Sequence, residues 1–135
     1  MNYILLITII LVGCSVNQKD QITFEGTCDQ FSESRHLTWN VQTKLGDSLL
    51  VTLCSNPTTG FQWRDYVEIS DENILNQTSH DFFPPGKTML GSSGLEQWTL
   101  NSLKKGTSVV VWEYSRPWEG GEKKEWSLTA TVVVD

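Results

Sequence analysis

Alternation of apolar and polar residues, with a period of two, begins at His36 and restricts this chain to a fold built from strands. In the last stretch, EWSLTATVVV, every second residue from Trp126 to Val134 is apolar, as in a strand with one buried face. The same alternation recurs in HLTWNV, DSLLVTLC, FQWRDYV, EQWTLNSL and TSVVVWEYS. Only SDENILNQ suits a helical turn. About seven short strands within roughly 100 residues predict an all-β fold, a β-sandwich or a closely related barrel.

Length and composition support one domain of this kind. The chain has 135 residues, of which 39% are hydrophobic, and it includes six Trp and five Phe, enough for one sizeable core. Its formal net charge is -6, and its lysines and arginines form no long cluster. A protein that binds the phosphate backbone needs such a cluster, so we expect no nucleic-acid partner.

The first residues are typical of an export signal. The apolar run Tyr3–Val12 is too short to span a bilayer and has the length of a signal-peptide core. The stretch LVGC, which ends at Cys14, resembles a bacterial lipobox, in which that cysteine carries a lipid. The alternative is an ordinary signal peptide cleaved near Ser15.

These observations predict a signal peptide or lipoprotein signal at 1–15, a linker or N-terminal extension with one short strand around ITF at 16–35, and the folded domain at 36–135. Either type of signal predicts export. The protein would be lipid-anchored at the cell envelope if Cys14 is a lipobox cysteine, and otherwise secreted or held in a secretory or lysosomal lumen.

Cys28 and Cys54 remain once Cys14 is set aside. An oxidising compartment would let the two form a disulfide. As unpaired residues they would serve equally well as small hydrophobic side chains, so the sequence leaves both states open. Asn76 stands in a glycosylation sequon, which matters only if the source glycosylates its proteins.

Three unusual loops are expected at one end of the sandwich, because strands that run up and down place every second loop at the same end. We name them the Asn56 loop (55–60), the Ser93 loop (84–94) and the Trp118 loop (115–123). Loops that a rigid scaffold gathers at one end are typical of a binding surface.

The Asn56 loop, SNPTTG, has a composition that predicts stiffness. Asn56 can form an Asx turn, Pro57 fixes its own φ, and Gly60 can take a positive φ. Thr58 and Thr59 have restricted χ1 angles and lose little further entropy on binding. The sequence therefore predicts a preorganised ridge with two hydroxyl groups at its crest.

The Trp118 loop contains Arg116, Pro117 and Trp118 among turn residues. An exposed Trp near an Arg is the composition of an interface hot spot, and the alternative is a Trp folded down over the end of the sandwich. The Ser93 loop offers Gly91, Ser92, Ser93 and Gly94, which let a backbone lie close against a partner. By itself this last pattern carries little weight.

Taken in order, NPTTGFQW, FFPPGKTMLGSSGLEQW and YSRPWEGG resemble the chagasin-like inhibitors of papain-family cysteine peptidases. The resemblance covers His36 to Val134 and implies an immunoglobulin-like antiparallel β-sandwich of about seven strands that is no enzyme. It implies that residues 56–60 enter the active-site cleft of the peptidase while 91–94 and 116–118 clamp its flanks, with Trp118 on the primed side. The family commonly has Gly where this chain has Ser93, which would alter the shape of that loop.

This resemblance and the stiffness of the Asn56 loop predict reversible, non-covalent, substrate-competitive inhibition by a monomer in a one-to-one complex. A stiff turn fills the cleft without offering a carbonyl group to the thiolate at attack geometry. Thr58 and Thr59 would lie near the catalytic Cys–His pair of the peptidase.

Other functions find less support in the sequence. A nucleophilic arrangement of Cys54, His80 and Asp81 has no local signature. With His36 and His80 as the only histidines, we expect surface histidines, no metal site and no cofactor. A different class of function is an exported immunoglobulin-like module that binds carbohydrate or a surface protein through the same loops, with Trp118 stacking on a sugar.

Overall fold

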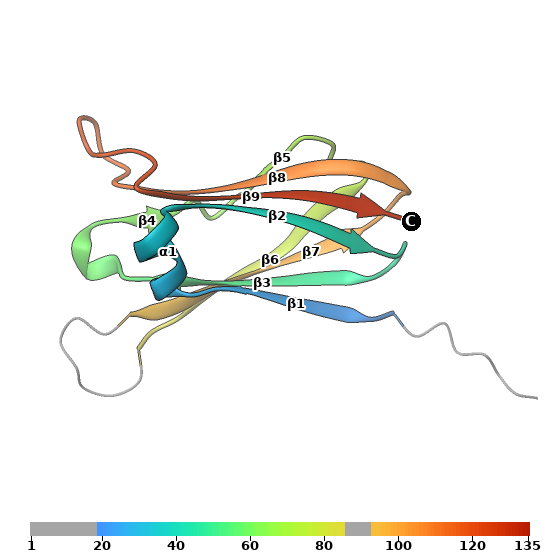
Figure 1. Ribbon diagram of the computed structural model, residues 1–135, viewed down its shortest axis with the longest axis horizontal. Coiled ribbons are helices and arrows are strands. Elements are labelled where there is room, and N and C mark those ends of the chain that lie inside the picture. Colours follow the sequence, from blue (N-terminus) through green and yellow to red (C-terminus); the bar gives the residue numbers. More distant parts are fainter. Residues whose placement is uncertain (1–18, 86–92) are drawn as a thin grey trace, which may run out of the picture.

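The computed structural model describes residues 19–85 and 93–135, which form a sandwich of two β-sheets (Figure 1). One sheet has the strand order β1-β3-β7-β6, and the other has the order β2-β9-β8-β4, with β5 also paired to β8. The strands are β1 (Gln21–Gly26), β2 (His36–Thr43), β3 (Ser48–Ser55), β4 (Gln62–Trp63), β5 (Glu68–Ile69), β6 (Leu75–Phe83), β7 (Gly94–Ser102), β8 (Gly106–Ser115) and β9 (Trp126–Val134). The prediction of an all-β sandwich is confirmed.

Two strand pairs run parallel, whereas the sequence interpretation expected antiparallel pairing throughout. Strand β1 pairs in parallel with β3, and β2 pairs in parallel with β9. The chain crosses between the sheets on either side of β2, so these neighbours are not consecutive in sequence. Strands joined by a crossover can run parallel, and period-two alternation reports which face is buried without reporting strand direction.

The segment before His36 is part of the fold. The short strand expected around ITF is present as β1, but the described residues of 16–35 do not form a linker. Strand β1 lies at the edge of one sheet, and helix α1 (Cys28–Ser34) carries the chain to the other. A capping box begins the helix: the Thr27 hydroxyl accepts from the Gln30 N–H at 3.2 Å, and the Gln30 side chain accepts from the Thr27 N–H at 2.9 Å. The helix places Phe31 in the core with none of its surface exposed.

Phe31→Ala is expected to lower the free energy of unfolding by about 3–5 kcal/mol, the usual cost of truncating a buried Phe. The Phe31 ring stacks on Trp126 with centroids 5.2 Å apart and also packs against Trp63 at 5.3 Å. Urea denaturation of both proteins measures the loss. Phe24→Ala, at a half-buried position of β1, is the matched control and should cost clearly less. Equal stability of wild type and Phe31→Ala would contradict a core role for α1.

Aromatic residues fill the space between the sheets. Trp98 and Trp112 are at most 1% exposed and meet edge to face with centroids 6.3 Å apart. The stretch SDENILNQ, for which a helical turn was the sequence expectation, forms hydrogen-bonded turns and then enters β6 at Leu75. Within residues 19–85 and 93–135, no helix is long and apolar enough to cross a membrane.

One end of the sandwich holds segments that were expected there because strands that run up and down place every second loop at the same end. The connection from β3 to β4 and the connection from β8 to β9 both lie at this end (Figure 1), where β6 also ends and β7 begins. There Phe83 is in register with Leu95. Gly91 and Ser92 of the Ser93 loop lie outside the described residues, and so do Cys14 and the whole 1–15 signal.

Candidate functional site

The Asn56 loop folds into a single turn of 3₁₀-helix, η1 (Pro57–Thr59), which begins after Asn56 and ends at Gly60. The N–H of Thr59 donates to the Asn56 carbonyl at 3.3 Å, and the N–H of Gly60 donates to the Pro57 carbonyl at 3.0 Å. Gly60 has a φ of +83°, in the left-handed region that favours glycine. The chain therefore leaves the turn sharply, and the side chains of residues 57–59 remain exposed.

Both threonine hydroxyls bond back into the loop. Thr58 Oγ1 donates to Asn56 Oδ1 at 2.6 Å, and Thr59 Oγ1 donates to the Asn56 carbonyl at 2.8 Å. The side chain of Asn56 makes no capping bond to the backbone, so the expected Asx turn is absent and Thr58 Oγ1 is its partner instead. The two threonines thus brace the turn from within.

Tyr114 and Trp63 hold the base of the loop from below. The Tyr114 hydroxyl accepts from the Asn56 N–H at 3.0 Å and donates to the Asn56 carbonyl at 3.2 Å. The indole N–H of Trp63, a residue only 2% exposed, donates to the Cys54 carbonyl at 2.9 Å. Their rings pack with centroids 4.8 Å apart, so the loop stands on a buried aromatic pair.

The Trp118 loop is joined to the Asn56 loop. Arg116 donates to the Thr59 carbonyl from Nε at 3.3 Å and from Nη2 at 3.2 Å. The Arg116 guanidinium carbon lies 4.4 Å from the ring centroid of Phe61. Trp118 covers Gly60 so closely that a Cβ atom there would lie 2.6 Å from Trp118 Cη2. Because Trp118 is still 52% exposed, the two loops present one continuous surface.

A disulfide joins Cys28 at the start of α1 to Cys54 near the end of β3, with their Cα atoms 5.2 Å apart. Cys28 Sγ lies 3.3 Å from the hydroxyl oxygen of Ser93, the residue before β7. Next to it, a Cβ at Gly94 would lie 2.5 Å from the Phe83 carbonyl oxygen, so the strands approach closely there. The bridge therefore ties α1 to the strand that leads into the Asn56 loop.

A known protein family matches most of the residues that form this sandwich. The sequence profile described as "Chagasin family peptidase inhibitor I42" matches residues 42–132, which is more than half of the chain. The chain belongs to the chagasin family of peptidase inhibitors.

Other chagasin-family proteins agree with the assignment. Amoebiasin-2 of Entamoeba histolytica is 33% identical over 100 residues, which cover 73% of this chain and 75% of that protein. Chagasin of Trypanosoma cruzi is 35% identical over 80 residues, 56% of this chain and 71% of chagasin. The crystal structure of the cysteine protease inhibitor EhICP2 from Entamoeba histolytica superposes with a TM-score of 0.65 at 26% identity, over 85% of this chain and 97% of that one.

A further structure, PbICP-C in complex with falcipain-2, shares the chagasin-family fold with a TM-score of 0.60. The match has 15% identity and covers 86% of this chain and 99% of that one. Together the profile and the relatives place the chain in a family of cysteine-protease inhibitors and not of enzymes.

The structure also removes the nucleophilic arrangement of Cys54, His80 and Asp81. Cys54 is bonded to Cys28 and has no free thiol. His80 faces Asp65 and Glu96 instead of Asp81, which is exposed. The expectation of surface histidines holds for His36, which is exposed, but fails for His80, whose side chain is only 19% exposed.

Tyr114 supports the Asn56 loop of this chagasin-family chain, and sequence reasoning did not predict that role. Its ionisation should make the stability of the protein depend on pH. Burial raises the pKa of the Tyr114 phenol above its ordinary value of 10.0, and the hydrogen bond to the Asn56 backbone opposes the shift in part. A raised pKa in the folded state adds stability that is complete below the unfolded pKa and is lost as pH rises through the folded pKa.

Tyr114→Phe should therefore lower the free energy of unfolding at neutral pH by about 1–3 kcal/mol, because it keeps the ring and removes both bonds to Asn56. The decline of stability above about pH 10 should be shallower in this variant than in wild type. Denaturation curves at a series of alkaline pH values measure both effects. Tyr66→Phe is the control, since Tyr66 is 82% exposed and should behave as wild type. Identical pH profiles for wild type and Tyr114→Phe would contradict the assignment.

Proposed function

We propose that this protein is a reversible, non-covalent inhibitor of papain-family cysteine peptidases, with the Asn56 loop as the element that fills the active-site cleft. Residues 56–60 would enter the cleft, 116–118 would contact one flank, and 91–94 would contact the other. The observation that carries the proposal is the contact between the Asn56 loop and the Trp118 loop. In it, Arg116 donates hydrogen bonds to the Thr59 carbonyl and Trp118 covers Gly60. PbICP-C, a protein of the same fold, was solved in complex with falcipain-2.

The geometry of η1 explains why such a loop would inhibit and not be cleaved. A peptidase of this class attacks a carbonyl carbon of an extended peptide and stabilises the resulting oxyanion. The carbonyl groups of Asn56, Pro57 and Thr59 already accept hydrogen bonds within the two loops. The backbone is coiled in a turn, so these groups are not presented as an extended strand.

Preorganisation would supply much of the affinity. The turn is held by bonds within η1, by Tyr114 beneath it and by Arg116 beside it. Little conformational freedom remains to be lost when the loop enters a cleft, and that loss is a principal cost of association. The complex would contain one inhibitor and one peptidase molecule, with the inhibitor acting as a monomer.

The test is the hydrolysis of a dipeptide fluorogenic substrate by papain at increasing concentrations of the protein. We expect hydrolysis to fall and to recover as the substrate concentration is raised, which is the behaviour of a competitive inhibitor. Dilution of the complex should restore activity, and the recovered inhibitor should be intact. No inhibition of papain or of several related enzymes would contradict the proposal and would favour a sandwich module that binds carbohydrate or a surface protein.

We further propose that the protein works outside the cytoplasm, since a disulfide joining Cys28 and Cys54 suits an oxidising compartment. If Cys14 is a lipobox cysteine, the protein would be anchored to a membrane at the cell envelope. Growth of the expressing cells with a labelled fatty acid tests this point. Cys14→Ala should lose the label and the membrane fraction, whereas unchanged partitioning would show that Cys14 is not the anchor.

A further inference from the structure

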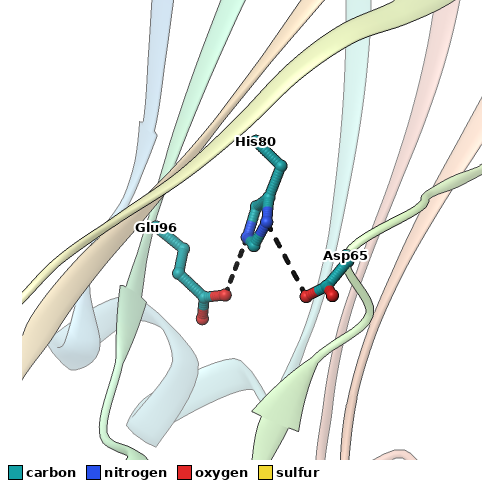
Figure 2. Close-up of side chains that lie close together, drawn as sticks. All are labelled: Asp65, His80 and Glu96. Carbon is teal, nitrogen blue, oxygen red and sulfur yellow. Dashed lines mark hydrogen bonds and ion pairs between the residues drawn. The ribbon is translucent and has the colours of Figure 1, made fainter.

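A cluster of ligand-type side chains that the proposed function does not use is formed by Asp65, His80 and Glu96 (Figure 2). His80 Nε2 lies 2.9 Å from Glu96 Oε1, and His80 Nδ1 lies 3.7 Å from Asp65 Oδ1. One ligand atom from each residue can be chosen so that all three lie within 4.8 Å of one another. Two carboxylates therefore face one imidazole.

The strand register explains how His80 and Glu96 come together. His80 is in register with Trp98, and Glu96 is in register with Phe82 two residues farther along β6. His80 and Glu96 are thus diagonal neighbours on the face that carries the fully buried Trp98. The His80 ring lies 4.9 Å from the Trp98 ring between centroids, and Glu96 is only 7% exposed. Both side chains therefore face the interior of the sandwich.

Asp65 reaches the same place from the other sheet, because it follows β4. Its carbonyl accepts from the Trp98 indole N–H at 3.1 Å and from Gln77 Nε2 at 2.7 Å. Gln77 Oε1 accepts in turn from the Val67 N–H at 3.0 Å. These bonds fix the backbone at Asp65, while its side chain is 75% exposed.

Two hollows give a small ion access to the cluster. One of about 310 Å³ is lined by Asp65, Tyr66 and His80 together with residues 77–79 of β6. Another of about 170 Å³ reaches Asp65 and Glu96 from the side of Pro57 and Phe82. The cluster therefore lies between openings at the edge of the sandwich and is not sealed inside it.

We propose that Asp65, His80 and Glu96 form a site for one divalent transition-metal cation, with Zn²⁺ as the best fit. Zinc accepts a mixed set of imidazole and carboxylate ligands, whereas Mg²⁺ and Ca²⁺ prefer oxygen ligands alone. With ligand bonds of about 2.0–2.2 Å, the ligand atoms of a tetrahedral zinc lie ~3.3 Å apart. The ion would bind a single ring nitrogen of His80, and the exposed Asp65 carboxylate would have to move toward that nitrogen to join Glu96. The fourth position would stay open to solvent.

The metal would replace the His80–Glu96 hydrogen bond and would connect the two sheets at the β6 edge. Strands β6 and β7 belong to one sheet and Asp65 follows β4 of the other, so the ion would cross-link the layers. A cation that binds only the folded protein also raises its stability in proportion to the logarithm of its concentration. The site thus predicts a zinc-dependent rise in melting temperature.

Titration of the full chain, without an affinity tag, with ZnCl₂ in a non-chelating buffer tests the proposal by calorimetry and by thermal unfolding. We expect one zinc per chain, a rise in melting temperature that EDTA reverses, and no comparable rise with MgCl₂. His80→Gln and Asp65→Asn should each weaken zinc binding by more than about tenfold. Because Asp65 is exposed, Asp65→Asn keeps the test valid even if His80→Gln fails to fold.

Matched controls exist in the chain itself. His36→Gln removes the only other histidine, and Asp81→Asn removes an exposed carboxylate next to His80 in β6. Both variants should bind zinc as wild type does. The proposal is overturned by the absence of saturable zinc binding, or by binding that persists in His80→Gln and Asp65→Asn. Peptidase inhibition is measured in a separate assay, so a failure of the zinc proposal can be distinguished from a failure of the proposed function.

Discussion

Gly60→Ala is expected to weaken inhibition of papain by about 100-fold, which corresponds to a loss of roughly 2.7 kcal/mol in binding free energy. Two effects add. The φ of +83° at Gly60 is unfavourable for alanine, at a cost of about 1–2 kcal/mol. The new Cβ would also lie 2.6 Å from Trp118 Cη2, so Trp118 must move away from the Asn56 loop. Inhibition constants from the fluorogenic assay measure the change.

Gly46→Ala is the matched control for this experiment, because Gly46 lies at the opposite end of the sandwich from the proposed peptidase-binding surface. Gly46 also has a positive φ, of +91°. A Cβ atom there would come no closer than 3.8 Å to Lys19 Cε, an ordinary contact, so the variant carries the backbone strain without a clash. We expect its inhibition constant to stay within a few-fold of wild type. Equal effects of Gly60→Ala and Gly46→Ala would show that the contact with Trp118 does not matter.

Removal of the Cys28–Cys54 disulfide should also have a large effect, in this case on the stability of the fold. The double variant Cys28→Ala, Cys54→Ala is expected to lose about 3.5 kcal/mol of unfolding free energy, as the loop-entropy estimate gives for a closed loop of this size. The cysteines are 26 residues apart, and the bridge fixes α1 against the strand that leads into Asn56. Urea denaturation with and without reductant measures the loss.

Reductant provides the internal control for the disulfide. It should destabilise the wild-type protein by a similar amount and should leave the double variant unchanged. In the double variant, the loss of binding free energy toward the peptidase should be smaller than the loss of unfolding free energy. The reason is that Tyr114 and Arg116 still hold the Asn56 loop. A double variant as stable as wild type would contradict a stabilising role for the bridge.

The sequence was sufficient to predict the sandwich and the shared end of the Asn56 and Trp118 loops, because burial alternates along β2, β7, β8 and β9 and parity orders the loops. It did not predict the role of the segment before His36. There Phe31 and the Cys28–Cys54 disulfide hold a helix of seven residues in place, and this helix is too short for helical periodicity to stand out. The capping pair Thr27 and Gln30 was the available signal for a helix start.

Other site features depend on contacts between residues far apart in the sequence. Tyr114 occupies an ordinary inward position of β8, and nothing local marks it as the partner of Asn56, which lies 58 residues earlier. The threonine hydroxyls were expected at the crest of the loop, but the structure turns them onto Asn56. Asp65 and Glu96 meet His80 only through strand register and sheet packing, which a pattern of residue types does not contain.

The central claim is that the end of the sandwich formed by the Asn56 and Trp118 loops is the surface that binds a peptidase. Amide hydrogen exchange of the free protein and of its complex with papain tests this claim most directly. We expect added protection in peptides that contain residues 56–61 and 116–121, and no change at the opposite end, around 44–47 and 103–106. Protection at that opposite end, with exchange in 56–61 unchanged, would contradict the account.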